Sequence, residues 1–388
     1  MADERETGET RTLRLVIAAG GTGGHISPVL ATLAPLRARG PVEATWIGGT
    51  WGIERGKADE AGVPFVAIQT GKLRRYLSWQ TPPDLLRVPL GFAQAWRALA
   101  RLRPDVVFST GGYVAVPTAL AAARRGIPVL THEQTAQLGL ATRIICRVAD
   151  VLTLSFPTVP DGTVIGKARV IHTGNPVRPE LFDGDAAQGA AHFGLSPDLP
   201  TIYVTGGARG STPINIRLEA ALPQLLTHMQ IIHATGPVEA NDDYAKLRRV
   251  RDALPEELRR RYAVVETTGA ELRDVYALAT LVVGRSGAGT VAELAALGKP
   301  SLLIPLPGTG GDEATKNARV LADAGAALLR PQTEVTGDSL AADALALIRD
   351  PTKLAAMRAA ALALAPTDAA SALADAILAL ANQRSVTR

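Results

Sequence analysis

The sequence predicts an α/β protein of two doubly wound domains, each a parallel sheet covered by helices on both faces. Short β-branched runs alternate with helix-like segments along almost the whole chain, which is typical of parallel sheets. The length of 388 residues exceeds the size at which one hydrophobic core keeps growing. A strand followed by a glycine turn occurs at 16–25 (VIAAGGTGGH) and again at 203–212 (YVTGGARGST), so each half of the chain begins with the same pattern.

The strands and helices follow from this alternation. The expected strands of the first half are the runs 13–18, 44–48, 64–69, 105–110, 127–132 and 150–156. Those of the second half are 201–206, 229–236, 263–269, 280–287, 300–307 and 326–331. Helices are expected between them, for example at 28–39, 115–125, 272–279, 290–297 and 314–324. From Ser339 the chain reads as alanine-rich helix, interrupted at Pro351 and Pro366.

The domain boundaries follow from changes in composition. Residues 1–12 are charged and polar and are expected to be a flexible leader. Two prolines and a glycine at 172–179 (HTGNPVRP) break the alternation, which predicts domains at 13–177 and 178–365. Open α/β sheets bind ligands outside the carboxyl ends of their strands, so we expect the site in a cleft between the two domains.

The composition excludes several functional classes. A hydrophobic content of 47% with 20% charged residues is typical of globular proteins. Cys146 is the only cysteine, so an internal disulfide and a cysteine-rich zinc site are excluded, and a reducing cytoplasm fits. The net charge of +4 suits anionic partners, but no basic–aromatic pattern of a nucleic-acid module is present.

The stretch from Lys72 to Arg103 combines positive charge with bulky apolar side chains. It holds seven basic residues against one acid, Asp84. This composition suits an element that lies on a membrane surface, and it equally suits an amphipathic helix with a solvated basic face. The candidate membrane contacts are Lys72, Arg74, Arg75, Tyr76, Trp79, Arg87, Phe92 and Trp96.

The first glycine turn, AAGGTGGHISP at 18–28, predicts an anion site. Four of the five residues 20–24 are glycine and His25 follows. A dinucleotide fingerprint would need glycine where Ile26 stands, and no P-loop motif occurs in the chain. What is left is a strand-to-helix turn that exposes backbone N–H groups to a bulky anion such as a diphosphate. A tight turn alone would need fewer glycines. An imidazole beside such a turn can act as a general base.

The second half carries a related pair of motifs. GGARG at 206–210 offers a second nest of N–H groups, and GRSGAGTVAEL at 284–294 opens a helix. Glu293 lies about two turns into that helix, where a carboxylate can accept hydrogen bonds from two ribose hydroxyls, and an exposed helix acid is the alternative. His132, in VLTHEQTA, ends a strand, but it is not spaced from His25 as a metal ligand within one element.

Several motifs together resemble one family. In order along the chain they are GGTGGHISPVLA (20–31), GGYVAVPTALAA (111–122), HEQTAQLGLATR (132–143), TGNPVR (173–178) and RSGAGTVAELAALGKPSLLIPLP (285–307). This set resembles the bacterial MurG-type N-acetylglucosaminyltransferases. The resemblance implies the GT-B architecture, in which an N-terminal Rossmann-like domain takes the acceptor and a C-terminal one takes the UDP-sugar. It also implies that the final helix, about 366–388, packs back on the first domain.

The resemblance implies a reaction as well. GlcNAc would move from UDP-GlcNAc to undecaprenyl-diphosphoryl-MurNAc-pentapeptide (lipid I), giving lipid II. His25 would take the proton from the MurNAc C4 hydroxyl, which attacks C1 of GlcNAc with inversion. No metal and no cofactor beyond the donor substrate is expected. The implied acceptor-diphosphate residues are Gly20, Gly21, Thr22, Gly23, Gly24, Gly111, Gly112, Tyr113, His132, Glu133 and Gln134.

The donor side is implied in the same way. Glu293 would hold the ribose, the backbone near Gly269 would meet uracil, and the helix after Gly287 would stabilise the leaving diphosphate. The implied UDP-sugar residues are Asn175, Arg178, Gly207, Ala208, Arg209, Gly210, Gly269, Arg285, Ser286, Gly287, Ala288, Gly289, Thr290, Glu293, Ala314 and Asn317. The basic stretch would contact the inner leaflet, which places the protein peripherally on the cytoplasmic face of the membrane, with no nucleic-acid partner.

Departures from the family pattern fall on the donor side. Ala208 and Arg209 stand where the family usually has serine and glutamine, and Ala314 stands where it usually has the glutamine that bonds the donor sugar. Three alternatives therefore stay open. They are a GT-B transferase that moves another UDP-linked sugar onto a glycolipid or small hydrophobic acceptor, a nucleotide-sugar epimerase, and a binding relative without turnover.

Overall fold

The computed structural model describes residues 11–21, 23–71, 81–156, 164–240, 242–365 and 368–386. The chain divides into two compact units, one of residues 1–176 with 368–388 and one of residues 177–367. The first boundary lies one residue before the predicted one, at 176/177 instead of 177/178. The last helix belongs to the first unit.

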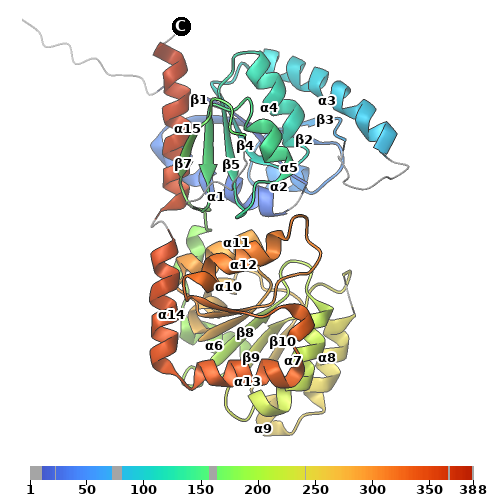
Figure 1. Ribbon diagram of the computed structural model, residues 1–388, viewed down its shortest axis with the longest axis vertical. Coiled ribbons are helices and arrows are strands. Elements are labelled where there is room, and N and C mark those ends of the chain that lie inside the picture. Colours follow the sequence, from blue (N-terminus) through green and yellow to red (C-terminus); the bar gives the residue numbers. More distant parts are fainter. Residues whose placement is uncertain are drawn as a thin grey trace, which may run out of the picture. The chain divides into compact units, whose positions relative to one another are not determined.

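The first unit holds seven strands and the helices that cover them (Figure 1). Its strands are β1 (Leu13–Ala19), β2 (Val42–Gly49), β3 (Phe65–Ile68), β4 (Val106–Gly111), β5 (Val129–Glu133), β6 (Val151–Leu154) and β7 (Arg169–His172). Its helices are α1 (Gly23–Arg39), α2 (Glu54–Glu60), α3 (Thr81–Leu102), α4 (Ala115–Arg124), α5 (Leu140–Ile145) and α15 (Ala369–Val386).

The sheet of the first unit is parallel throughout, in the order β3-β2-β1-β4-β5-β6-β7. The order reverses between β1 and β4, whose ends are in register at Ala19 and Gly111. Ligands of doubly wound folds bind at such a reversal, at the carboxyl ends of the strands. Both glycine motifs of this unit, 20–24 and 111–112, therefore leave the sheet at the same point.

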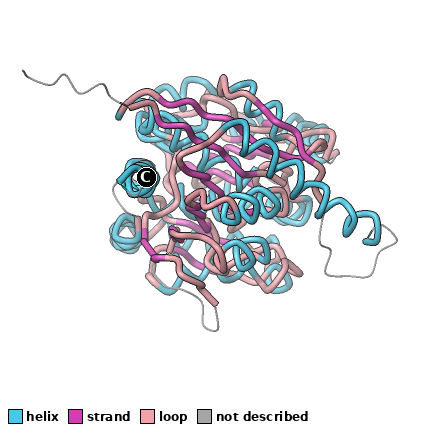
Figure 2. Tube along the Cα trace, turned by 90° about the horizontal axis from the view of Figure 1, so that it is seen from above, coloured by secondary structure: helices cyan, strands magenta, loops and turns pink. Residues whose placement is uncertain are grey.

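The core of the first unit shows why β1 is apolar at almost every position. Leu15 and Ile17 pack with α1 and α15 on one face, while Val16 and Ala18 pack with α3, α4 and α5 on the other. Successive side chains of a strand point to opposite faces, so a strand covered on both sides carries no polar alternation. In the tube view the strands are seen with helices on either side (Figure 2).

The alternation missed one strand. β7 (Arg169–His172) pairs in parallel with β6 at the edge of the sheet, and most of its residues are exposed. Because one of its faces is not buried, the segment lacks the continuous apolar run by which the other strands were found.

The second unit repeats the design with six parallel strands in the order β10-β9-β8-β11-β12-β13. Its strands are β8 (Thr201–Thr205), β9 (Gln230–Ala234), β10 (Tyr262–Val265), β11 (Leu281–Gly284), β12 (Ser301–Leu303) and β13 (Ala327–Leu329). Its helices are α6 (Ala186–Phe193), α7 (Thr212–Leu225), α8 (Asp243–Asp252), α9 (Glu256–Arg259), α10 (Leu272–Leu278), α11 (Ala288–Ala296), α12 (Glu313–Asp323), α13 (Gly337–Ile348) and α14 (Pro351–Leu364), with short 3-10 turns η1 (Pro179–Asp183) and η2 (Gln332–Glu334).

The core of the second unit lies between this sheet and α7, α13 and α14, while α10, α11 and α12 cover the other face (Figure 1). Here the order reverses between β8 and β11, which are in register at Thr205 and Gly284. The two glycine motifs of the second half, 206–210 and 285–289, therefore leave this sheet side by side. The predicted fold class, two doubly wound parallel-sheet domains, is confirmed.

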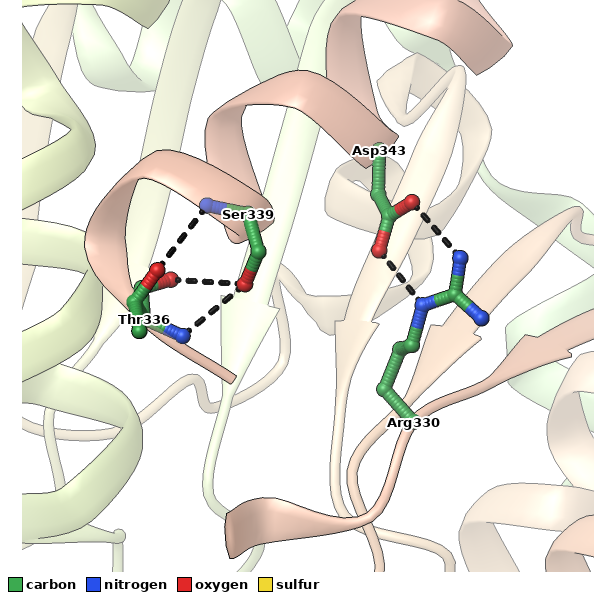
Figure 3. A network of polar contacts seen from close by, with 4 residues as sticks. All are labelled: Arg330, Thr336, Ser339 and Asp343. Carbon is green, nitrogen blue, oxygen red and sulfur yellow. Dashed lines mark hydrogen bonds and ion pairs between the residues drawn. The ribbon is translucent and has the colours of Figure 1, made fainter. Parts of the chain in front are cut away.

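Helix α13 is held at its start by polar contacts between Thr336 and Ser339 (Figure 3). Thr336 Oγ1 accepts the N–H of Ser339 at 3.1 Å, and Ser339 Oγ accepts the N–H of Thr336 at 2.9 Å. Both bonds satisfy donors that the helix itself cannot satisfy. One turn further on, Asp343 receives a two-pronged ion pair from Arg330 at 2.7 and 2.9 Å, which ties α13 to the end of β13.

Removing the cap should destabilise the second unit. We expect Thr336→Ala to lower the free energy of unfolding by about 1 kcal/mol, the usual loss for a threonine N-cap, because α13 carries the core residues Leu340 and Ala344. Urea unfolding would measure the change. Thr352→Ala, at an exposed position inside α14, is the control and should change stability by less than half as much. Equal effects of the two substitutions would remove the cap as the cause.

One stretch, Pro351–Gln383, could cross a membrane by length and composition alone, with a mean hydropathy of 1.3 over its best window. In the described residues it consists of two helices, α14 and α15. Met357 of α14 is buried in the core of the second unit, and Leu373 and Ile377 of α15 are buried in the core of the first. Packing against the two sheets accounts for their apolar character.

Candidate active site

Two glycine turns meet at the carboxyl edge of the first sheet. Gly21 follows β1 with a φ of 89°, and Gly111 and Gly112 end β4 with φ values of 84° and 78°, a region that side chains strongly disfavour. A Cβ on Gly112 would collide with the carbonyl oxygen of Gly20. The second turn is therefore glycine because the first one passes directly over it.

His25 lies in the first turn of α1, beside these glycines. Its Nδ1 is 2.8 Å from the carbonyl oxygen of Thr110, and the Thr110 hydroxyl donates to the carbonyl oxygen of His25 at 2.5 Å. A carbonyl oxygen only accepts, so Nδ1 carries the proton and donates it. The other ring nitrogen, Nε2, is then the atom with a free lone pair, and it lies between the two ring carbons that face Gly111 and Gly112.

Gln134 completes the support of the imidazole. Its amide lies 2.5 Å from Nδ1 of His25, and its other amide atom is buried without a partner among the described residues. The oxygen and nitrogen of an amide are assigned from the hydrogen bonds that they make. Since Nδ1 donates to Thr110, we assign the amide atom of Gln134 that lies next to Nδ1 as the oxygen. This oxygen then accepts the same N–H in a bifurcated hydrogen bond. Two neutral acceptors thus fix the tautomer of His25.

His25 and the two turns line one pocket of the first unit. The pocket is lined by Gly20, Gly21, His25, Gly112, Tyr113 and Thr142, with apolar side chains from α3, α4 and α5 around them. Thr22, which was predicted to bind the acceptor, lies outside the described residues. The structure thus brings together His25, three of the predicted glycines and Tyr113.

The HEQ motif was predicted to bind the acceptor, and this stays a prediction, while the side chains of His132 and Glu133 are engaged within the scaffold. His132 is fully buried, with Nδ1 3.0 Å from the Thr153 hydroxyl and Nε2 3.3 Å from the Ser155 hydroxyl. Burial lowers the pKa of His132 to about 4, although a hydrogen bond with Asn175 opposes the shift. The imidazole is therefore neutral and ties β5 to the segments beside it.

Glu133 is also buried and organises the loop that follows β5. Its carboxylate accepts the N–H of Thr135 at 3.1 Å, the Thr135 hydroxyl at 2.9 Å and the N–H of Gly139 at 3.0 Å. These bonds fix residues 133–139, whose last glycine lines the pocket. His132 and Glu133 thus hold the segments around the pocket in place, while Gln134 contacts His25.

Sequence reasoning missed Glu54. It is the first residue of α2 and only 1% exposed, and its Oε1 accepts the N–H of Gly21 at 2.5 Å. The letters GIERG at 52–56 resemble the start of any surface helix. The carboxylate is buried because this loop lies against the first glycine turn, a contact between distant segments that no local sequence pattern shows.

In the second unit, Arg285 joins the two glycine turns. It is buried, and its guanidinium donates to the Ser211 hydroxyl at 2.8 Å, to Gln332 at 2.6 Å and to the carbonyl oxygens of Ile304 and Pro305 at 2.9 and 3.0 Å. Burial lowers its pKa to about 10, with a contribution from the charge of Arg217. Four internal bonds engage Arg285 in the scaffold, and the residue also lines the pocket of the glycine turn at 206–210, so its contact with the nucleotide stays a prediction.

Three further residues of the predicted donor side, Ser286, Ala314 and Asn317, also make contacts within the scaffold. The Ser286 hydroxyl donates to the carbonyl oxygen of Ala314 at 2.6 Å, and Asn317 donates to the carbonyl oxygen of Ser286 at 3.3 Å. All three residues are buried and join the start of α11 to α12, and their contact with a donor stays a prediction. Asn175 belongs to the first unit, where it contacts His132 at 3.4 Å.

Glu293 keeps its predicted setting on α11. Its Oε2 accepts the Tyr276 hydroxyl at 2.8 Å, and its Oε1 lies 3.8 Å from Arg178 Nη2. Burial raises the pKa of this carboxyl above its ordinary value, while the bond to Tyr276 and the charge of Arg178 oppose the rise. The side chain keeps 20% exposure, so Oε1 is the oxygen that a bound molecule could reach.

The remaining donor-side residues lie at the predicted turns. Ala208, Arg209 and Gly210 line a pocket together with Ser211 and Leu306, and Gly207 and Gly210 have positive φ values of 80° and 70°. Helix α11 begins at Ala288, after the extended Gly287, and no atom lies within 4 Å of a Cβ built on Gly289. Gly289 and Thr290 are half-buried in the first turn of α11. The N–H of Gly269 donates to Glu271 at 2.8 Å.

The predicted membrane contacts are described only in part. Lys72, Arg74, Arg75, Tyr76 and Trp79 lie outside the described residues, whereas Arg87, Phe92 and Trp96 lie on α3. The rings of Phe92 and Trp96 stack at 6.1 Å, and the guanidinium of Arg125 lies 4.6 Å from the Trp96 ring.

Among the described residues, no group of three or more histidine, cysteine, aspartate or glutamate side chains is placed to hold a metal ion.

Two parallel sheets, each with paired glycine turns at the point where its strand order reverses, form the GT-B architecture, and the family models identify it as that of a glycosyltransferase. The model of the glycosyltransferase family 28 N-terminal domain matches residues 15–153, and that of the family 28 C-terminal domain matches residues 201–376. The chain belongs to the MurG family, the UDP-N-acetylglucosamine–N-acetylmuramyl-(pentapeptide) pyrophosphoryl-undecaprenol N-acetylglucosamine transferases.

Three relatives carry this assignment. The transferase of that name from Desulforudis audaxviator is 37% identical, over 96% of this chain and 99% of the relative. Its counterpart from a Nocardioides species is 39% identical, over 95% and 98%. The crystal structure of Acinetobacter baumannii MurG superposes with a TM-score of 0.73 at 28% identity, covering 94% of this chain and 99% of the other. The predicted family is therefore confirmed.

Proposed function

We propose that this protein transfers GlcNAc from UDP-GlcNAc to the MurNAc C4 hydroxyl of undecaprenyl-diphosphoryl-MurNAc-pentapeptide. The observation that carries the proposal is His25. Its Nδ1 is engaged by Thr110 and Gln134, which leaves Nε2 as a base in a pocket lined by two glycine turns. The reaction is the one that the names of the two curated relatives describe.

The chemistry follows from that tautomer. Nε2 of His25 takes the proton of the acceptor hydroxyl as its oxygen forms a bond to C1 of GlcNAc. The bond between C1 and the diphosphate oxygen breaks on the opposite side, its electron pair leaves with UDP, and the configuration at C1 inverts. Thr110 and Gln134 orient the ring for this transfer without becoming charged themselves, as the third member of a catalytic triad orients its histidine.

The acceptor diphosphate would lie at the start of α1. The first N–H groups of a helix have no partner within the helix and attract anions. The N–H of Gly21 is already engaged by Glu54, so we assign the diphosphate to the helix start and not to that amide. Tyr113, which lines the same pocket, is placed to contact the same ligand.

The donor would bind at the second pair of turns. Glu293 would accept the ribose hydroxyls through Oε1, and Arg209, which lines the pocket beside Gly210, would reach the diphosphate. Helix α11, which begins at Ala288, would stabilise the charge that develops on the leaving group. Because Ala314 has no side-chain amide, it cannot make the sugar contact that the family's glutamine makes, so the donor sugar must be tested directly.

A turnover assay read by mass spectrometry tests this proposal. The purified chain would meet a soluble short-chain lipid I analogue with UDP-GlcNAc, UDP-glucose, UDP-galactose or UDP-GalNAc in parallel wells. We expect a product heavier by one N-acetylhexosamine with UDP-GlcNAc alone. A hexose product would favour another donor, and no product despite measurable UDP binding would reject lipid I as the acceptor.

We further propose that the first unit binds the cytoplasmic face of the membrane through the α3–α4 side. A groove there has an apolar floor that includes Phe92 and Leu120, and Arg124, Arg147 and Lys167 stand at its rim. Leu90, on the same helix as Phe92, is 49% exposed. Apolar side chains beside basic ones are the composition that inserts between anionic headgroups.

Vesicle binding tests this part of the proposal. Each basic residue near an anionic surface contributes about 1 kcal/mol, so Arg147→Gln should weaken binding to phosphatidylcholine vesicles containing phosphatidylglycerol by about fivefold. Arg319→Gln, at an exposed position of the second unit, removes the same charge and should leave binding unchanged. Co-sedimentation measures both. An equal loss in both variants would indicate net charge alone, and no binding by the wild type would refute the membrane role.

A further inference from the structure

Glu54 is a buried carboxylate that the reaction above does not use. It is 1% exposed, although it follows two strongly exposed apolar residues, Trp51 at 82% and Ile53 at 54%. On the same short helix, Glu60 is exposed and pairs with Lys57 at 2.6 Å. Burying an ionisable group costs free energy unless it is compensated by bonds, so the inward position of Glu54 calls for a specific partner.

That partner is the first glycine turn. The N–H of Gly21 donates to Glu54 Oε1 at 2.5 Å. Two glycines make room for the carboxylate, because a Cβ on Gly20 would collide with Oε1 and a Cβ on Gly52 would collide with Oε2. Gly20 and Gly52 also have positive φ values of 156° and 147°, so the backbone conformation and the carboxylate both favour glycine at these two positions.

Among the described residues, this hydrogen bond is the one polar contact of the Glu54 carboxylate. Oε2 of Glu54 is buried and has no hydrogen-bond partner among the described residues. A carboxylate that served only as a helix cap or ion-pair partner would engage both oxygens or stay in water. Its one polar contact in the described part of the chain leads to the turn that lines the acceptor pocket.

The hydrogen bond between Glu54 and Gly21 is linked to His25 in two ways. Gly21 is followed along the chain by α1, which carries His25 in its first turn. The carbonyl of Gly20 lies against Gly112, and a Cβ on Gly112 would lie 3.3 Å from His25 Cδ2. A shift of the turn at 20–21 therefore moves one wall of the pocket and the residue that stacks against the imidazole.

We propose that Glu54 is a positioning residue for the acceptor: its carboxylate clamps Gly21, sets the shape of the first glycine turn beside His25, and withholds one N–H from the acceptor's diphosphate. The inference rests on the proposed function and deepens it. It assigns the acceptor's phosphates to the helix start and makes the loop 51–54 part of the acceptor side. The donor site, which lies in the other unit, takes no part in it.

Steady-state kinetics of matched variants test the clamp. Glu54→Ala should raise the acceptor KM about tenfold or more, the loss expected for a hydrogen bond to a charged group, and should leave the donor KM and the UDP affinity within about twofold. Glu54→Gln keeps an oxygen for Gly21 and should restore the acceptor KM to within about threefold of wild type. Glu60→Ala, in the same helix, is the control for loss of charge.

A second pair of variants keeps Glu54 and changes the space around its carboxylate. Gly52→Ala forces it away from Gly21 and should reproduce the rise in acceptor KM. Gly56→Ala, where a Cβ meets no atom within 4 Å, should match the wild type. An unchanged acceptor KM in Glu54→Ala and Gly52→Ala would overturn the proposal. So would an equal rise of donor and acceptor KM in these variants, because that indicates a general loss of structure.

Hydrogen exchange separates failure of the clamp from failure of the proposed function. Protection of the amide of Gly21 should fall in Glu54→Ala and persist in Glu54→Gln, whether or not the chain turns over lipid I. If the wild type makes no transfer product but the protection follows this order, the clamp stands and the proposed function fails. If the protection is unchanged in Glu54→Ala, the clamp is refuted.

Discussion

Replacement of His25 by alanine is expected to lower kcat by about 10²–10⁴-fold, the usual contribution of a positioned general base. The substitution removes Nε2, the one nitrogen of the ring that the hydrogen bonds to Thr110 and Gln134 leave free. UDP affinity should stay within about twofold of wild type, because the nucleotide is assigned to the other unit. Single-turnover mass spectrometry with the lipid I analogue measures the chemical step directly.

The control for this variant is His192→Ala. His192 lies on α6 of the second unit, where its ring packs edge-on against Phe193 at 4.6 Å, and its loss should leave kcat unchanged. Wild-type turnover in His25→Ala would exclude the imidazole as the base. A loss of UDP affinity that parallels the loss of kcat would indicate that the substitution disturbs more than the chemical step.

Gln134 gives a graded version of the same test. With Gln134→Ala, the carbonyl of Thr110 still accepts from Nδ1, so the tautomer persists and only part of the orientation is lost. One neutral hydrogen bond corresponds to a two- to tenfold effect, about 1 kcal/mol. A loss as large as that of His25→Ala would mean that Gln134 contacts substrate itself.

The sequence was sufficient to predict the sheets because both are covered on two sides. Continuous apolar strands such as β1 and β8 stand out from the helices between them, and their glycine-rich ends mark the points where the strand order reverses. Position in a doubly wound fold follows from chain order, so His25 could be placed beside the first glycine turn, and Glu293 about two turns into the helix after the last one, before any coordinates. β7 was missed because its residues are largely exposed and carry no such run.

The roles of individual polar side chains could not be predicted in the same way. His132, Arg285 and Asn317 occur in family motifs, yet each is buried and bonded within the scaffold. Whether a polar residue at a strand end faces the ligand or the element behind it depends on contacts between segments far apart in sequence. Glu54 is the opposite case, a residue whose local sequence suggests an exposed helix but which lies at the site. Its contact with Gly21 spans 33 positions.

Replacement of Glu293 by alanine should weaken UDP binding by about ten- to a hundredfold. A charged carboxylate that accepts ribose hydroxyls contributes about 1.5–3 kcal/mol per bond, and Oε1 is the oxygen left for them, since Oε2 accepts from Tyr276. Calorimetric titration with UDP measures the change. Glu257→Ala, at an exposed glutamate of α9, is the control, and unchanged affinity in Glu293→Ala would remove this carboxylate from the site.

The pH dependence gives an independent check of the same carboxylate. Burial raises the pKa of Glu293, so the folded protein takes up this proton at a higher pH than the unfolded chain does. Between the two pKa values the folded state binds more protons, and the contribution of Glu293 to stability therefore falls as the pH rises. UDP affinity should change in the opposite direction, because only the charged form accepts two hydroxyls.

Glu293→Gln separates these two effects. It removes the charge but keeps an oxygen beside Tyr276, so the ligand-free protein should be at least as stable as wild type at neutral pH, while UDP binds more weakly and loses its dependence on acid pH. Thermal unfolding and calorimetry on one sample measure both quantities. A carboxylate kept only for structure would show the reverse, with lower stability and unchanged affinity, so the pair of measurements decides whether this buried charge is retained for the nucleotide.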